Sequence, residues 1–161
     1  MKINLLACMP HDVQRNLVQK HYGAGSSMLL SDYENNYVFF LMSGYAEAYI
    51  QNAEGSMAFI FCYEPNSVFG EIEPFYEGNL KPVSIIAITN CDVKILHKDH
   101  FLAWLKNDFN AVKVLIQTIS EKLVKNGLLI EEMSLMNVCE RVLRCIYIYN
   151  YRNMLIFLSK R

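Results

Sequence analysis

Short hydrophobic runs alternate with turn-forming residues through the middle of the chain, from about residue 28 to residue 96. The runs are rich in β-branched and aromatic side chains, and each has about the length of one strand. They occupy residues 37–42, 46–50, 57–62, 83–89 and 93–96. Strands of this length at this spacing predict an antiparallel sandwich, roll or barrel.

Helical periodicity flanks this region on both sides. Before it, hydrophobic residues recur at helical spacing, so residues 1–22 are expected to be helical up to the break at Gly23. After it, the helical period resumes at Lys98 and predicts a short amphipathic helix. Asp108 follows that helix and is a suitable N-cap for the next one.

The next stretch carries a strict heptad repeat. Its seam positions lie alternately four and three residues apart and are Val112, Ile116, Ile119, Leu123, Asn126, Ile130 and Met133. They predict one helix over residues 109–136, about 42 Å long. We favour a two-stranded parallel coiled coil, and therefore a homodimer, over one long helix in the core of a monomer. Asn126 would fix the register or face a ligand, and Gly127 would permit close approach of another backbone or a ligand.

Composition places the chain among folded globular proteins. Of its 161 residues 53% are hydrophobic and 19% are charged, and the net charge of −1 does not indicate a general nucleic-acid or membrane-surface binder. Residues 138–161 nevertheless carry a net charge of +4. No hydrophobic run approaches the roughly 18 residues of a membrane span. The five cysteines form no CxxC pair, which favours a reduced cytoplasmic protein with Cys62 and Cys91 in its core.

Sequence motifs for catalysis are missing, and the chain is not expected to be an enzyme. His97 and His100 have a spacing that can ligate a metal, but no third ligand is evident, so surface and capping roles are favoured. No histidine lies between Tyr22 and Leu96, which argues against a metal-dependent cupin, the main enzyme alternative for a small β-roll. No metal or other cofactor is therefore predicted.

Four motifs in this order point to a known family. Residues 37–44 form a hydrophobic strand that ends in Ser-Gly, and residues 63–71 lead into Phe-Gly-Glu. Residues 91–101 join a strand to a short helix, and residues 134–142 have the pattern of a hinge. Together they resemble the Crp–Fnr family of bacterial transcription regulators and, more broadly, the cyclic nucleotide-binding domain.

The resemblance implies a fold that is mainly β with helices, an antiparallel double-stranded β-roll followed by a long dimerisation helix. It implies a β-roll effector-binding-like domain with flanking helices at residues 1–108 and the dimerisation helix at residues 109–136. Residues 137–161 would then be the hinge and the first-helix remnant of a DNA-binding domain.

The resemblance also implies an effector site, but with departures. Gly70 and Glu71 match the Gly-Glu of the phosphate-binding cassette, in which the Glu binds the ribose hydroxyl. The phosphate-binding Arg of the family matches Lys81, and the Ser or Thr after it matches Pro82. Lysine lacks the bidentate guanidinium fork, and proline has neither an amide donor nor a hydroxyl.

Further residues bear on the ligand. Glu73 and Glu77 add negative charge beside the anion site, whereas Asn126 and Gly127 match the adenine-contact positions of the family. We therefore expect an effector-sensing and dimerisation domain that does not respond to cyclic AMP and has an unknown small effector. The alternative is a constitutive dimerisation or partner-binding scaffold with no small-molecule ligand.

Recognition of a DNA sequence would require a domain that is missing from this chain, because in the family a winged helix-turn-helix domain follows the hinge. We expect a longer protein, the alternative being a natively truncated one. DNA is expected to be bound only through the missing domain, and contact with RNA polymerase would belong to the full-length form. No membrane partner is expected.

Overall fold

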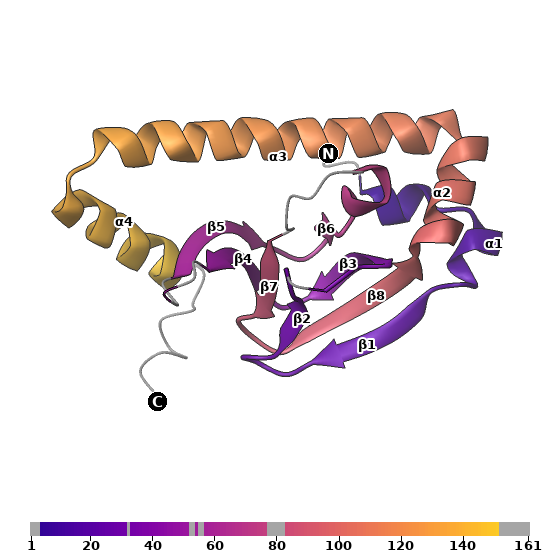
Figure 1. Cartoon of the computed structure of the whole chain (residues 1–161), viewed down its shortest axis with the longest axis horizontal. Coiled ribbons are helices and arrows are strands. Elements are labelled where there is room, and N and C mark those ends of the chain that lie inside the picture. The colour runs from indigo at the N-terminus through magenta and orange to yellow at the C-terminus, as the bar shows by residue number, and fades with distance from the viewer. Residues whose placement is uncertain (1–3, 32, 52–53, 55–56, 77–82, 152–161) are drawn as a thin grey trace. The chain divides into compact units, whose positions relative to one another are not determined.

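The computed structural model describes residues 4–31, 33–51, 54, 57–76 and 83–151 (Figure 1). The chain divides into two compact units, Met1–Ser120 and Glu121–Arg161. The first unit contains the β-roll and its flanking helices, and the second contains the end of the long helix and the helix after it.

The described strands of the first unit form two antiparallel four-stranded sheets. One sheet has the order β1-β8-β3-β6 and the other β2-β7-β4-β5. The strands are β1 (Val18–Tyr22), β2 (Ser27–Leu29), β3 (Tyr37–Ser43), β4 (Ala46–Gln51), β5 (Met57–Tyr63), β6 (Val68–Phe69), β7 (Ser84–Ala87) and β8 (Cys91–His97). This arrangement confirms the predicted β-roll.

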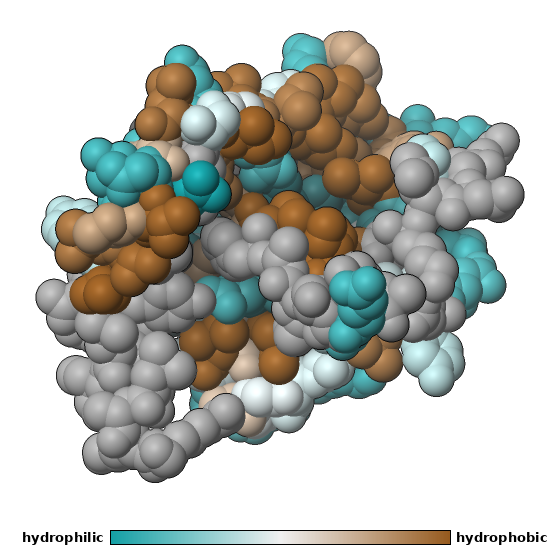
Figure 2. Space-filling view, turned by 60° about the vertical axis from the view of Figure 1, so that its left-hand side comes forward, coloured by the Kyte–Doolittle hydropathy of each residue, from teal (hydrophilic) through white to brown (hydrophobic). Residues whose placement is uncertain are grey.

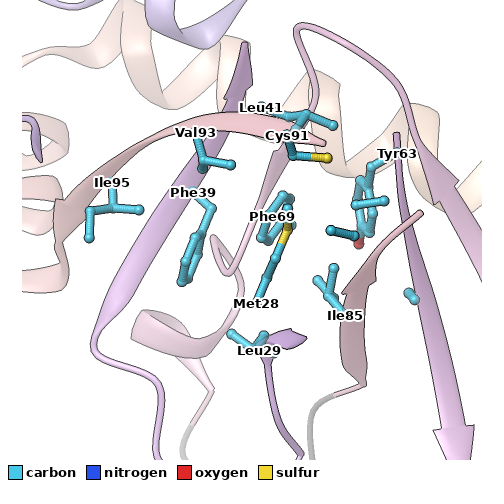
Figure 3. Close-up of a cluster of buried hydrophobic side chains, with 13 residues drawn as sticks. Met28, Leu29, Phe39, Leu41, Tyr63, Phe69, Ile85, Cys91, Val93 and Ile95 are labelled. Carbon is cyan, nitrogen blue, oxygen red and sulfur yellow. The ribbon is translucent and has the colours of Figure 1, made fainter. Parts of the chain in front are cut away.

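Strand β3 is buried on both faces. Its successive side chains point to opposite sides, and each side packs in a core. Phe39 and Leu41 belong to the core between the two sheets, and Val38 and Phe40 to a second core beneath the helices. Phe69 of β6 stacks on Phe39 with ring centroids 4.9 Å apart, and Figure 3 shows both rings in the inner core. Two hydrophobic cores therefore share one central strand.

The second core fixes the start of the long helix to the roll. Helix α2 (Lys98–Asn107) contributes Phe101 and Trp104, and helix α3 (Phe109–Leu135) contributes Ala111 and Leu115. Asp108 caps α3, since its Oδ1 accepts hydrogen bonds from the backbone N–H groups of residues 110 and 111. The predicted short helix and N-cap are thereby confirmed.

The N-terminal segment corrects the prediction of one helix over residues 1–22. It contains a 3₁₀ turn, η1 (Leu5–Cys8), the short helix α1 (His11–Gln14) and strand β1, which pairs with β8. Val13 and Leu17 have helical spacing because both pack against the second core. β1 is a largely exposed edge strand, so no buried face marks it in the sequence.

The prediction of the long helix is confirmed to within one residue, because α3 ends at Leu135 and α4 (Val138–Tyr151) follows. A reciprocal capping box starts α4. Asn137 Oδ1 accepts from the backbone N–H of Glu140, and a Glu140 carboxylate oxygen accepts from the backbone N–H of Asn137. Within the second unit an ion pair joins Arg144 of α4 to Glu132 of α3.

Candidate functional site

The candidate site begins where β6 ends in a tight turn at Gly70. The φ of Gly70 is +77°, a region that side chains rarely adopt. A β-carbon there would lie 2.6 Å from the carbonyl oxygen of Tyr37 and 2.8 Å from Nδ2 of Asn35. The Asn35 side chain also bonds to the backbone of Tyr37, at 2.7 and 3.0 Å, so it braces the strand that Gly70 crosses.

Glu71 follows this turn and is a buried acid, only 2% exposed. Its negative charge acts on Tyr63, a residue of the core between the two sheets. Burial raises the pKa of Tyr63, and the negative charges of Glu71 and Glu73 raise it further. Both acids, Glu71 and Glu73, therefore act on the phenol of Tyr63.

The residues after Glu71 form a short 3₁₀ turn, η2 (Glu73–Phe75), at the surface. Ile72, Phe75 and Tyr76 are each about half exposed. The Phe75 ring lies edge-on to Phe101, with ring centroids 6.4 Å apart, and so extends the second core. Lys81 and Pro82, the predicted departures from the phosphate cassette, lie outside the described residues, as does Glu77.

The predicted site residues of the long helix lie in the second unit. Asn126 is half-buried, and its Oδ1 is buried without a hydrogen-bond partner among the described residues. A β-carbon at Gly127 would have nothing within 4 Å, so no contact in the described chain requires glycine there. The roles predicted for these two residues remain predictions.

The seam of α3 consists of two rows, each with a period of seven residues. The outer row is Ile116, Leu123 and Ile130, which are 58%, 72% and 69% exposed. Figure 2 shows hydrophobic side chains open at the surface of the molecule. The inner row is Val112, Ile119, Asn126 and Met133. Val112 and Ile119 are partly buried against the second core, and the side chain of Met133 is not described.

Sequence reasoning missed two residues around these features, Phe109 and Tyr63. Phe109 is exposed and stands seven residues before Ile116, so the heptad spacing itself could have extended the outer row to it. Tyr63 of β5 packs on Phe69 of β6 with ring centroids 5.1 Å apart and is within the electrostatic influence of Glu71, and no local pattern in the sequence marks this arrangement.

Histidine and acidic residues near α2 have structural roles. His97 caps α2, because its Nδ1 lies 3.4 Å from the backbone N of Asp99.

The described part of the chain contains no group of three or more His, Cys, Asp or Glu residues that could hold a metal ion. Cys62 and Cys91 are buried, as predicted. Among the described residues, no helix has the length and apolar character needed to cross a membrane.

Solved structures share this fold. Catabolite activator protein from Thermus thermophilus has a TM-score of 0.65 and 16% identity, over 81% of this chain and 62% of its own. The c-di-GMP responsive global regulator CLP from Xanthomonas campestris has a TM-score of 0.69 and 10% identity, over 83% and 67%. A protein from Eubacterium rectale, described as a transcriptional regulator of the Crp/Fnr family, has a TM-score of 0.82 and 14% identity, over 94% and 73%.

These identities are low enough that the structural likeness shows the fold alone, and the chain spans less than two thirds of the Thermus protein. No curated protein matches the chain in sequence. Residues 19–108 match the family described as the cyclic nucleotide-binding domain, which is more than half of the chain. The chain therefore belongs to the cyclic nucleotide-binding domain family, and Crp/Fnr transcription regulators are among its structural neighbours.

Proposed function

We propose that the chain is the effector-sensing and dimerisation part of a Crp–Fnr-like transcription regulator, and that its signal is not cyclic AMP. The observation that carries the second part is the makeup of the cassette. Glu71, which matches the ribose-binding acid of the family, is buried, but Glu73 follows two residues later and adds a further negative charge. A cyclic phosphate beside that charge needs positive compensation.

The sequence offers little of that compensation. Lys81 stands where the family has its phosphate-binding arginine, and Glu77 adds a further negative charge. Lysine acts as a point charge without the two parallel hydrogen bonds of a guanidinium. Pro82 contributes neither an N–H nor a hydroxyl. The Xanthomonas protein of the same fold is named as responsive to c-di-GMP, so a signal other than cyclic AMP is compatible with this fold.

Dimerisation is supported by the outer row of the α3 seam. Ile116, Leu123 and Ile130 are large, hydrophobic and mostly exposed in the single chain. Burying such side chains against a second helix is favourable by roughly 1.5–3 kcal/mol each. A parallel pair of α3 helices would cover them, and the half-buried Asn126 of the inner row would then help to set the register.

DNA binding, the output of such a regulator, would be carried by a domain that follows α4. The basic residues of α4 fit a position next to a DNA-binding domain. An effector would change the balance between two dimer states at the joint near Asn137 and so re-aim such domains. In this account DNA and RNA polymerase would be contacted through a DNA-binding domain, and the sensing domain itself would have no enzymatic activity.

Calorimetric titration of the purified chain with cyclic AMP and with cyclic GMP tests the ligand part of the proposal. We expect no saturable heat at millimolar nucleotide. Saturable binding at micromolar concentrations would mean that Glu71 and Lys81 form a working cassette, and it would overturn this part. If further small effectors also fail to bind a dimeric chain, the alternative of a ligand-free scaffold gains support instead.

A further inference from the structure

A surface cleft of about 420 Å³ lies between α1 and α2, within the first unit. The two helices are neighbours at the right-hand side of Figure 1. The volume is in the range of recognised ligand sites, which begins at about 300 Å³. The cleft is formed by a part of the chain that belongs to neither the phosphate cassette nor the α3 seam. Its polar lining comprises Asp12, Asn16, His100, Asn107 and Asp108.

The amide groups of this lining donate hydrogen bonds within the chain. Asn107 Nδ2 donates to the carbonyl oxygen of Ala103 at 2.8 Å, and Asn16 Nδ2 donates to the carbonyl oxygen of Asp12 at 3.2 Å. Because an amide nitrogen carries two N–H groups, Asn107 keeps one N–H as well as its Oδ1 atom for a ligand. The amides therefore match a donor or an acceptor, and the charged groups decide the kind of ligand.

Charge indicates the kind of ligand. Asp12 and Asp108 both line the cleft, and none of its described lining residues is a lysine or an arginine. Hydrogen bonds from the backbone N–H of Ala111 and from Trp104 lower the pKa of Asp108, so this carboxylate stays ionised at neutral pH. The cleft thus favours a cation that carries several N–H donors.

The cleft also has an apolar wall. Trp104 is only 4% exposed, and its Nε1 donates to Asp108 at 3.2 Å, which fixes the indole in place. Val13 of α1 is a partly buried part of the same lining. Such a wall suits the aliphatic stem of a basic side chain, while its charged head meets the carboxylates.

We propose that this cleft is a docking site for a basic side chain, arginine or lysine, of a partner protein. A free small cation is a poorer fit, because Asp12, Asn16 and His100 are exposed and the ion would keep much of its water there. A side chain that belongs to a larger interface is held in place by contacts elsewhere, so less freedom is lost at the cleft itself. The proposal does not depend on what the cassette binds.

Trp104 provides a local probe, because it is the only tryptophan of the chain. The test is a titration of the full chain with a short peptide of alternating arginine and glycine, followed by the indole N–H resonance of Trp104 in NMR. We expect a saturable shift that weakens with added salt. The same peptide with citrulline in place of arginine keeps the shape, loses the charge, and should cause no shift.

Variants locate the site. Asp12→Asn combined with Asp108→Asn removes both charges and keeps an N-cap residue at 108, since Asn caps as well as Asp. Affinity for the arginine peptide should fall by at least about tenfold. The control is Asp99→Asn, because Asp99 is an acid of α2 that does not line the cleft. This variant should leave the affinity for the arginine peptide unchanged. If the double variant does not fold, Asp12→Asn alone provides the test, because this residue is exposed.

Three results would overturn the proposal. The indole resonance of Trp104 does not move with the arginine peptide, the citrulline peptide moves it equally, or removal of the charges leaves the affinity unchanged.

Discussion

Gly70 lies directly against the backbone of Tyr37, so that a β-carbon at residue 70 would be 2.6 Å from the carbonyl oxygen of Tyr37. The left-handed φ of +77° adds to this constraint. We expect Gly70→Ala to destabilise the fold by at least about 1–2 kcal/mol, the cost of the left-handed backbone alone. Urea unfolding of the variant measures this change.

The matched control is Gly127→Ala, because Gly127 is in the interior of α3 with open space around it. Alanine there should stabilise the helix by about 1 kcal/mol. If both variants change the free energy of unfolding by the same amount, the structural reason given for Gly70 is wrong. If Gly127→Ala weakens a dimer, close approach at Gly127 is indicated.

Asp92 of β8 contacts one side chain of β1 and one of β3 at the surface. We expect these contacts to make the stability of the fold depend on acid. His21 Nδ1 lies 3.0 Å from its carboxylate, and Ser43 donates a hydrogen bond at 2.8 Å. These contacts, that of His21 first, lower the pKa of Asp92 from its ordinary value of 3.8. Because the folded-state pKa is the lower one, the stabilisation is present above pH 3.8 and is lost as pH falls through the folded-state pKa.

Urea unfolding of the wild type and of Asp92→Asn at neutral pH and at about pH 3 checks this prediction. The difference in stability between the two proteins should shrink on acidification. Ser43→Ala, which removes one of the two contacts, should show a smaller part of the same pH dependence. A difference that stays constant with pH would contradict the role given to Asp92.

The strands with long hydrophobic runs could be predicted from sequence, because burial in a two-sided core leaves a clear pattern. β3 shows this best, since Val38 and Phe39 enter different cores. β1 could not be found in this way. It is an edge strand with mostly exposed side chains and is held by its backbone pairing to β8.

The candidate site was predictable only in part. Gly70 and Glu71 form a local motif that the sequence shows, and the structure adds the left-handed φ of Gly70 and the burial of Glu71. The influence of Glu71 on Tyr63 joins residues only eight positions apart, but no periodic pattern in the sequence marks it. The cleft between α1 and α2 was missed because it requires α1 to end before β1, whereas residues 1–22 were expected to be one helix.

The cassette account predicts a gain of function. If Lys81 occupies the position of the family's phosphate-binding arginine, Lys81→Arg with Pro82→Ser should restore bidentate contacts, an amide and a hydroxyl. Affinity for cyclic AMP should rise by roughly 10- to 100-fold, as charge-assisted hydrogen bonds allow. Calorimetric titration measures this, with Lys81→Arg alone as the partial control. An unchanged affinity in the double variant would show that these two positions do not limit binding.

The dimer is the claim on which the proposed function most depends, and the molar mass of the chain in solution tests it most directly. Light scattering should give twice the chain mass of 18.7 kDa for the wild type. Leu123→Asp, in the outer row of the seam, should give the mass of one chain. Val124→Asp is the control, because Val124 is 60% exposed on the same helix but lies outside the seam, and it should remain dimeric. A monomeric wild type, or a Leu123→Asp variant that remains dimeric, would contradict the account.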